Sequence, residues 1–292
     1  MELSLLELAA LADHPLEFAI FLADEGYIRE EKPCIRETCD GTMRFAILSR
    51  QTDGFCHRCD RCRCWDSVKI GTFFEDSHLS IHQILAIAHC FQSSMSIVDA
   101  SVATGSHRNT VSKFYKRFRT KIHESLQDHP IEWDGDCIYE ADETYIGHVD
   151  AGNGTFIEQL WIAGFLNRAT GALAVYTVAN RTAAVLQQPI RANVPPNSII
   201  CTDSHPSYVS LGNEYIHRSV NHSAGEYSRH DYIEGWGQVV VHCNNMEEIW
   251  RELKRLMANK SCCNLTFLDE YCEELVFKRA HRTIFNLIKT YG

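Results

Sequence analysis

Six cysteines within 31 residues constrain the fold of this 292-residue chain more than any other feature of its sequence. The first two are separated by four residues, and the other four crowd into the run CHRCDRCRC. The six are Cys34, Cys39, Cys56, Cys59, Cys62 and Cys64. Two cysteine pairs about 20 residues apart are the usual layout of a tetrahedral zinc ribbon, because each turn supplies two thiolates. Scattered reduced cysteines without a metal are the alternative.

A tetrahedral site has four places, so six candidates exceed what one zinc ion needs. We expect Cys34, Cys39, Cys59 and Cys62 to be the zinc ligands, with Cys56 as the first substitute and His57 as a further one. The other seven of the 13 cysteines stand singly or as one adjacent pair on apolar elements. Free cysteine behaves as a small hydrophobe, so these are expected in the core.

The start of the chain predicts helices in residues 1–30 and no secretory signal, because acids accompany its apolar residues throughout. The cysteines are therefore expected to be thiols or metal ligands in a reducing compartment. No apolar run approaches the roughly 20 residues that span a bilayer, so we expect no membrane partner.

The net charge of −10 is unevenly distributed. Residues 50–121 carry 11 basic and six acidic side chains, whereas residues 122–292 carry 13 basic and 22 acidic ones. Distribution matters more than the sum for a nucleic-acid partner. The basic segment is therefore the expected source of sequence-independent affinity for DNA, and the acidic part should contribute little.

Residues 96–122, within this basic segment, have the pattern of a helix-turn-helix. A short helix ends near Gly105, which permits a sharp turn, and Ser106 can cap the next helix. Apolar residues follow one side of that helix and basic ones the other. The candidate DNA contacts are Arg108, Asn109, Lys113, Lys116, Arg117 and Arg119. Residues at the start of such a helix reach base edges and later ones meet phosphates. An amphipathic helix with a solvated basic face is the alternative.

Residues 137–292 predict a mixed α/β domain after a boundary at 128–136, where a proline and a glycine lie among acids. The pattern predicts strands, a helix, a strand and a later helix, in the order of an RNase H-like domain. These elements are expected at 137–149, 159–166, 172–178, 181–193, 198–202 and 243–260. The fold class is thus an α+β multidomain chain: helices at 1–30, a zinc ribbon at 34–74, a helix-turn-helix at 78–126 and this domain at 137–292.

Three carboxylates of this domain suggest a metal site. Asp142 lies on a predicted strand, Asp203 ends another, and Glu247 lies on the last helix with Lys254 two turns later on the same face. Carboxylates at strand ends, joined by one from a helix, can bind a pair of Mg²⁺ or Mn²⁺ ions that activate the attacking oxygen and stabilise the leaving oxygen of phosphoryl transfer. Each acid alone also has an ordinary structural interpretation: a turn cap, a pair with Arg251, or a solvated strand residue.

The chain resembles the Merlin-type DDE transposases and the related bacterial insertion-sequence transposases over nearly its full length. The matching motifs are GTFF at 71–74, DETYIG at 142–147, TD at 202–203, NHS at 221–223 and the pattern H-x-N-x-M-E-x-x-W-x-x-L-K-R at 242–255. In this pattern Glu247, not Glu248, falls on the third acid. Cys243 departs from the threonine usual in the family, and the segment GEYSRHDYIEGWGQ is less basic than is typical.

The resemblance implies an enzyme that cuts and joins double-stranded DNA at the terminal inverted repeats of a mobile element and in target DNA. It also implies a homodimer, because two transposon ends must be handled together, and a location in the nucleus in a eukaryote or otherwise in the cytoplasm. A domesticated DNA-binding regulator without transposition activity and a nuclease that never rejoins strands are the alternatives.

Overall fold

A computed structural model describes residues 4–146, 149–150, 156–157, 160–258 and 265–290 of the chain. These residues fold into two compact units, one formed by Met1–Lys121 with Thr283–Gly292 and the other by Ile122–Arg282. The division falls within the long helix α5 (Arg108–Asp128). In the part of the chain that is described, helices with the length and apolar character needed to cross a membrane are absent.

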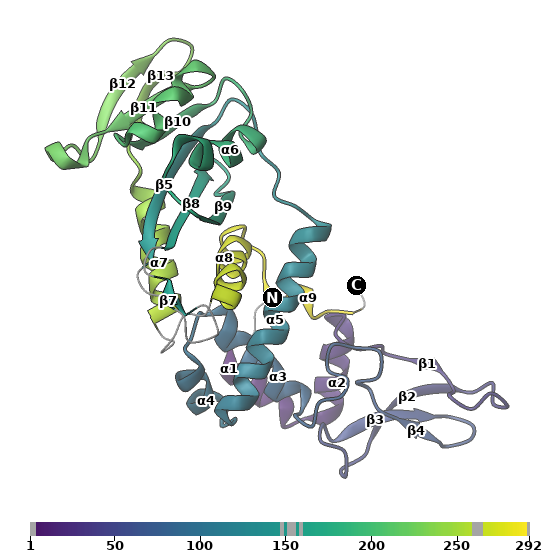
Figure 1. Ribbon diagram of the computed structural model, residues 1–292. Coiled ribbons are helices and arrows are strands. Elements are labelled where there is room, and N and C mark those ends of the chain that lie inside the picture. The colour runs from purple at the N-terminus through teal and green to yellow at the C-terminus, as the bar shows by residue number, and fades with distance from the viewer. Residues whose placement is uncertain (1–3, 147–148, 151–155, 158–159, 259–264, 291–292) are drawn as a thin grey trace. The chain divides into compact units, whose positions relative to one another are not determined.

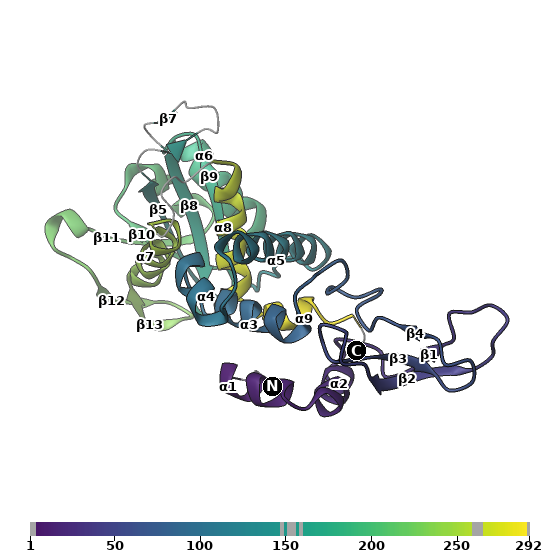
Figure 2. The same cartoon turned by 90° about the horizontal axis from the view of Figure 1, so that it is seen from below.

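The first unit begins with two helices and continues with a small antiparallel sheet of order β1-β2-β3-β4, whose strands lie side by side in both Figure 1 and Figure 2. The helices are α1 (Leu5–Ala12) and α2 (Pro15–Asp24). The strands are β1 (Lys32–Pro33), β2 (Thr42–Ile47), β3 (Phe55–Cys59) and β4 (Trp65–Asp66). Helices at the start of the chain agree with the sequence prediction.

Three helices complete the first unit: α3 (Ile81–Gln92), α4 (Ile97–Thr104) and α5, with the short α9 (Ile284–Leu287) returning to it. Ser80 begins α3 with a reciprocal capping box to Gln83. Most residues of α3 are buried. Aromatic side chains of α3 and α5 pack together, and the centres of the Phe91 and Phe118 rings lie 5.3 Å apart. Burial of these large rings contributes to the hydrophobic stabilisation of the unit.

The second unit is built on a five-stranded mixed sheet of order β11-β10-β5-β8-β9. The strands β5 (Ile138–Ile146), β8 (Leu160–Asn167) and β9 (Leu173–Val178) are antiparallel, and β10 (Ile199–Asp203) and β11 (Ile216–Val220) run parallel to β5. Short two-stranded ladders are formed by β6 (Val149–Asp150) with β7 (Phe156–Ile157) and by β12 (Arg229–Ile233) with β13 (Gly237–Val241).

Helices cover both faces of this sheet (Figure 1). On one face, α7 (Asn244–Ala258) and α8 (Leu265–Arg279) form a core with the even-numbered residues of β5 and β8. On the other, α6 (Ala183–Asn193) and the 3₁₀ helix η1 (Pro206–Asn213) pack on the odd-numbered residues Tyr139 and Ala141. The six elements expected from the sequence are all present, with ends within about three residues of the predicted ones.

The sequence did not predict β11, the β12–β13 hairpin or α8. The segment that departs from the family pattern, residues 225–238, contains most of that hairpin. The order of three antiparallel strands, a helix, a parallel strand and a helix carrying Glu247 is the one that the sequence led us to expect of an RNase H-like domain.

Candidate active site

Asp142 lies in the middle of β5, on the face that α7 covers. Because side chains alternate along a strand, Ala141 points into the core on the opposite face while Asp142 points toward α7. There the indole Nε1 of Trp250 donates a hydrogen bond of 2.9 Å to Asp142 Oδ2. The carboxylate is therefore held by one donor from the helix.

Gly164 makes this contact possible. It pairs with Asp142 across the β5–β8 ladder, and a Cβ at this position would stand 2.5 Å from the carbonyl oxygen of Ala174 and 3.1 Å from the Trp250 ring. A side chain there would displace the indole from the sheet. The absence of a side chain is thus required by close packing and not by the backbone angle.

Asp203 lies beside Asp142 because of the strand register. In the parallel β10–β5 pair, Cys201 is opposite Glu140, so Asp203 and Asp142 are each two residues further along and point to the same face. The backbone amide of His205 donates to Asp203 Oδ1 at 2.9 Å. Burial, together with the negative charges of Glu143 and Asp203, raises the pKa of Asp142 to about 8.

Glu247 lies in the first turn of α7, the helix that covers the face of β5 on which Asp142 lies. Its Oε1 lies 3.4 Å from His222 Nδ1. The thiol of Cys243 is fully buried, and its pKa is raised by that burial and by the charges of four nearby acids, Asp142, Asp203 and Glu247 among them. One buried thiol is thus within electrostatic range of all three predicted carboxylates, although their oxygen atoms do not all lie within 4.8 Å of one another.

Sequence patterns did not single out Glu140, yet this residue anchors α7. Glu140 is completely buried, and its carboxylate accepts hydrogen bonds from the backbone amides of Asn245 (3.0 Å) and Met246 (3.2 Å) in the first turn of the helix. A carboxylate at a helix N-terminus is favoured by the helix dipole and satisfies free amides. Glu140 therefore sets the position of α7, and with it that of Glu247, relative to β5.

Arg168 compensates the buried charge of Glu140. Its Nε donates to Glu140 Oε1 at 2.7 Å, and its two terminal nitrogens donate to the carbonyl oxygens of Val240 (2.6 Å) and His242 (2.7 Å). The guanidinium thereby joins β5 to the end of β13 and the start of α7. We call Glu140, Arg168 and Asn245 the β5–α7 clamp. The sequence signal for this clamp is that Glu140 and Asp142 are acids two residues apart on the same strand.

Glu143, next to Asp142, has a different environment on the other face of β5. Its carboxylate accepts from Arg181 Nε at 2.7 Å and from the Tyr208 hydroxyl at 2.6 Å. Both oxygens of the Glu143 carboxylate are thus engaged by side chains on this face of β5, which assigns Glu143 a structural role. Lys254, the predicted basic companion of Glu247, is exposed on α7.

The cysteine ligands predicted from the spacing lie together. One sulfur from each of Cys34, Cys39, Cys59 and Cys62 falls within 4.8 Å of the others, and among the described residues no further group of three or more metal-binding side chains meets that distance. Gly41 lets Cys59 approach, because a Cβ there would stand 2.6 Å from the Cys59 sulfur. The substitutes, Cys56 and His57, lie outside this group.

Two findings refine the cysteine prediction. Cys56 is buried on β3, and the neighbouring His57 forms a 2.9 Å hydrogen bond through Nε2 with the carbonyl of Arg29. Cys64, which the sequence left without a role, has its sulfur 3.3 Å from that of Cys62 and 3.5 Å from that of Cys34. A fifth thiol therefore borders the four-cysteine group.

The two helices α4 and α5 are joined by the expected turn at Gly105, whose φ of 62° is left-handed. The Ser101 hydroxyl donates to the carbonyl of Ser106 at 2.7 Å and ties the helices together. The exposed side of α5 presents Arg108, Asn109, Lys113 and Lys116.

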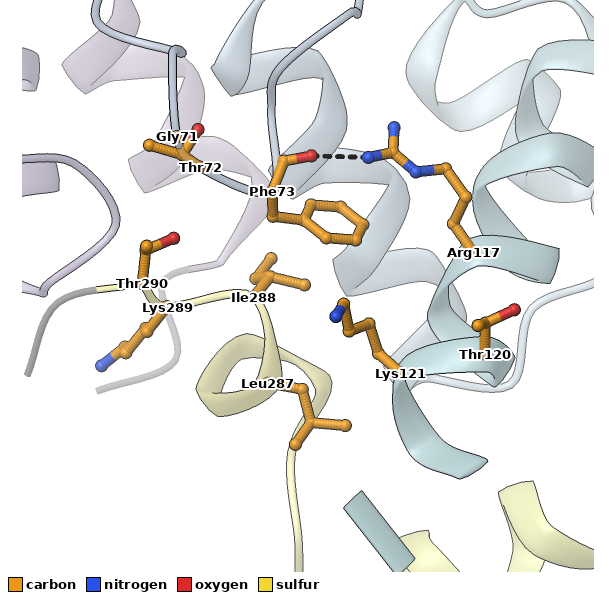
Figure 3. A pocket seen from close by; sticks show the side chains of 10 residues that line it. All are labelled: Gly71, Thr72, Phe73, Arg117, Thr120, Lys121, Leu287, Ile288, Lys289 and Thr290. Atoms are coloured by element: carbon orange, nitrogen blue, oxygen red, sulfur yellow. Dashed lines mark hydrogen bonds between the residues drawn. The ribbon is translucent and has the colours of Figure 1, made fainter. Parts of the chain in front are cut away.

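Two residues that the sequence placed on this basic side lie elsewhere. Arg119 is only 7% exposed and its guanidinium lies 5.6 Å from the centre of the Phe91 ring. The Arg117 guanidinium donates to the carbonyl of Phe73 at 2.7 Å and lies over the Phe73 ring, beside a pocket of about 580 Å³ that Lys121 and Thr290 also line (Figure 3). The predicted exposed face was wrong for Arg119, because arginine can bury its long side chain against aromatic rings.

Comparison with known proteins supports the interpretation of the second unit. Residues 136–280 match the ISXO2-like transposase domain. An uncharacterised transposase-like protein of Haemophilus influenzae is 41% identical over 71 residues, which cover 23% of this chain and 58% of that protein. The chain thus spans less than two thirds of the length of this relative.

Solved structures with some similarity include the HTLV-2 integrase catalytic core in complex with magnesium (11% identity, TM-score 0.30, 53% of this chain and 97% of that one). Another is the Mos1 strand transfer complex (10% identity, TM-score 0.22, 72% of this chain and 79% of that one). Because such TM-scores are too low to establish a shared fold, the assignment rests on the sheet topology and the family match. The resemblance to insertion-sequence transposases is confirmed, and residues 136–280 of this chain belong to the family of ISXO2-like transposase domains.

Proposed function

We propose that this protein is a DNA transposase that cleaves and joins DNA strands at the ends of a mobile element, using Asp142, Asp203 and Glu247 to hold two Mg²⁺ or Mn²⁺ ions. The observation that carries the proposal is the placement of Asp203 beside Asp142 on adjacent parallel strands, with Glu247 on the helix that covers them. This arrangement occurs in a domain of the transposase family.

The charge of the site fits a divalent cation. Burial is the largest cause of the raised pKa of Asp142, and the negative charges of Glu143 and Asp203 raise it further. Hard cations prefer such oxygen ligands and would relieve this repulsion. Glu140 and Glu143 are paired with arginines, so Asp142, Asp203 and Glu247 are the acids left to bind metal.

Each residue then has a distinct role. When bound, the two ions supply activation of the attacking oxygen and stabilisation of the leaving oxygen in an in-line phosphoryl transfer. Trp250 orients Asp142 through its indole N–H, and the β5–α7 clamp holds Glu247 at the correct height above the sheet. To Lys254, which is exposed two turns after Glu247, we assign a contact with a DNA phosphate as a point charge.

Incubation of the protein with supercoiled plasmid carrying candidate terminal repeats, in Mg²⁺ or Mn²⁺, tests the proposal. Cleavage followed by strand joining is the expected result, with two protomers acting on paired ends. Cleavage without joining would identify a nuclease. Specific DNA binding without either reaction would identify the domesticated regulator.

We further propose that Cys34, Cys39, Cys59 and Cys62 bind a structural zinc ion. Four thiolates at these distances match the donor set of a closed tetrahedral site. Removal of the metal with a strong chelator should unfold residues 34–74 selectively, since the folding free energy of such a small sheet is largely metal-binding free energy. Zinc content by atomic emission and hydrogen exchange over this segment measure the effect.

Cysteine substitutions give a sharper form of the zinc prediction. Cys59→Ser should lose zinc, whereas Cys56→Ser, a buried cysteine of the same strand outside the group, should keep it. Equal zinc content in both variants would contradict the ligand assignment. Zinc loss in Cys64→Ser would show that the fifth thiol is a ligand.

We also propose that the exposed side of α5 recognises DNA, since the acidic second unit cannot hold it by charge. Arg108→Ala or Asn109→Ala should relax sequence preference by about 1–3 kcal/mol if a bidentate base contact is lost. Lys116→Ala should weaken binding to all DNA about equally and make the salt dependence shallower. Affinities for terminal-repeat and random duplexes at several salt concentrations measure both effects.

Arg119 provides the matched control on the same helix. Because its side chain is buried on the Phe91 ring, Arg119→Lys should change the free energy of unfolding more than the salt dependence of DNA binding. If Arg108→Ala and Lys116→Ala had the same effect on both duplexes, this helix would be a general basic surface and sequence recognition would reside elsewhere.

A further inference from the structure

His222 lies at the same sheet edge as the proposed metal ligands. It begins the short 3₁₀ helix η2 (His222–Ala224), two residues after the end of β11. The last residue of β11, Val220, pairs with Asp203, and the Ser204 hydroxyl donates to the Val220 carbonyl at 2.9 Å. The carboxyl ends of the parallel strands β10 and β11 therefore bring His222 next to the site.

The backbone around His222 is braced by its neighbours. The side chain of Asn221 accepts from the amide of Ala224 at 3.2 Å, and the amide of Asn221 donates to Glu226 at 3.0 Å. Gly225 closes the turn with a left-handed φ of 79°, and the Tyr227 ring lies 5.4 Å from the imidazole. The position of the ring is thus set by local bonds.

The two ring nitrogens have different surroundings. Nδ1 lies 3.4 Å from Glu247 Oε1, the one ion-pair or hydrogen-bond partner of that carboxylate among the described residues. Nε2 is enclosed by protein and has no hydrogen-bond partner there. Leaving Nε2 buried and unpaired costs free energy. We therefore attribute the orientation of the ring to the contact that its other nitrogen, Nδ1, makes with Glu247. The enclosure of Nε2 also argues against its being a metal ligand.

We propose that His222 is a positioning residue for Glu247. Its Nδ1–H donates to Oε1 and thereby directs the other carboxylate oxygen toward the metal, as hydrogen bonds outside a metal's own ligands commonly do. The 3.4 Å contact is longer than an ideal hydrogen bond, and such bonds tighten when a catalytic complex assembles. The proposal rests on the proposed function, because it assumes that Glu247 is a ligand.

Two substitutions separate the nitrogens. The amide nitrogen of asparagine in His222→Asn takes the place of Nδ1, whereas that of glutamine in His222→Gln takes the place of Nε2. Both lose the ring contact with Tyr227, so they differ in the donor that they keep and in one methylene group. His230→Ala, an exposed histidine on β12, is the matched control.

The experiment measures binding of Mn²⁺ alone to the full chain. Bound Mn²⁺ is detected as a decrease of the electron paramagnetic resonance signal of the free ion. His222→Ala and His222→Gln should weaken binding by about tenfold or more, the effect typical of losing such a partner. His222→Asn should stay within about threefold of the wild type, and His230→Ala should match it. Thermal unfolding of each metal-free variant verifies that all are folded.

Equal binding by the Asn and Gln variants would overturn the proposal, whether both were weak or both were normal. Asp142→Asn separates this failure from that of the proposed function. If Asp142→Asn loses Mn²⁺ binding while every His222 variant keeps it, the metal site stands and His222 has no part in it. If the wild type binds no Mn²⁺, the proposed function itself fails.

Discussion

Asp142→Asn should reduce strand cleavage by about 10³-fold or more. Stabilisation by bound metal amounts to several kcal/mol of the barrier, and each 1.36 kcal/mol corresponds to a factor of ten in rate. The amide of asparagine keeps the shape of the side chain and one oxygen for the Trp250 indole, so the fold should persist. Cleavage of supercoiled plasmid in Mn²⁺ measures the rate, and duplex affinity should change little.

The free energy of unfolding of metal-free Asp142→Asn provides an independent control, because the substitution should raise stability where it lowers activity. The pKa of Asp142 is about 8 in the folded chain, above the roughly 3.9 of an unfolded aspartate. Its contribution to stability is therefore fully present below about pH 4 and is lost as the pH rises toward 8. Asp142→Asn should consequently be as stable as the wild type near pH 4 and more stable near pH 8.

Urea unfolding in a metal chelator at the two pH values measures this difference. A variant that lost both cleavage and stability at pH 8 would show that Asp142 is a structural residue. Such a result would contradict the assignment of Asp142 as a metal ligand.

Glu140→Gln should lower the free energy of unfolding by about 3–5 kcal/mol, the usual cost of removing one partner of a buried ion pair. The substitution leaves the charge of Arg168 without its counterion, and it puts an amide group where the helix amides of Asn245 and Met246 need an acceptor. Urea denaturation at neutral pH measures the loss.

The comparison of Glu140→Gln with Asp142→Asn is informative because the two acids lie two residues apart on one face of β5. Glu140 is satisfied by an arginine and a helix N-terminus, whereas Asp142 faces other acids. We expect opposite signs for their effects on metal-free stability. If both substitutions destabilised the protein equally, the β5–α7 clamp would not be distinguishable from the site that it supports.

Arg168→Lys tests the geometry of the clamp separately from its charge. Lysine keeps the positive charge but cannot donate at once to Glu140 and to the carbonyls of Val240 and His242. Its destabilisation should be smaller than that of Glu140→Gln, while cleavage should fall because α7 and Glu247 are held less firmly.

The sequence by itself determined the features that depend on spacing and periodicity. The pattern of β5 and β10 placed Asp142 and Asp203 on strands, and the helix predicted over residues 243–260 corresponds to α7, which carries Glu247. The cysteine spacing predicted which four thiols gather, because two short turns bring their ligands together wherever the sheet forms. Such features are local, so neighbouring residues specify them.

Only the tertiary structure decided which polar residues are paired across elements. Glu140 and Asp142 have the same strand alternation, and nothing local reveals that Arg168 reaches one and not the other. Arg119 was expected on the exposed side of its helix, but Phe91 of α3 provides a ring on which its long side chain is buried. His222 meets Glu247 only through the register of β10 with β11. These contacts join residues far apart in the chain, and their energy depends on burial and charge that no local pattern encodes.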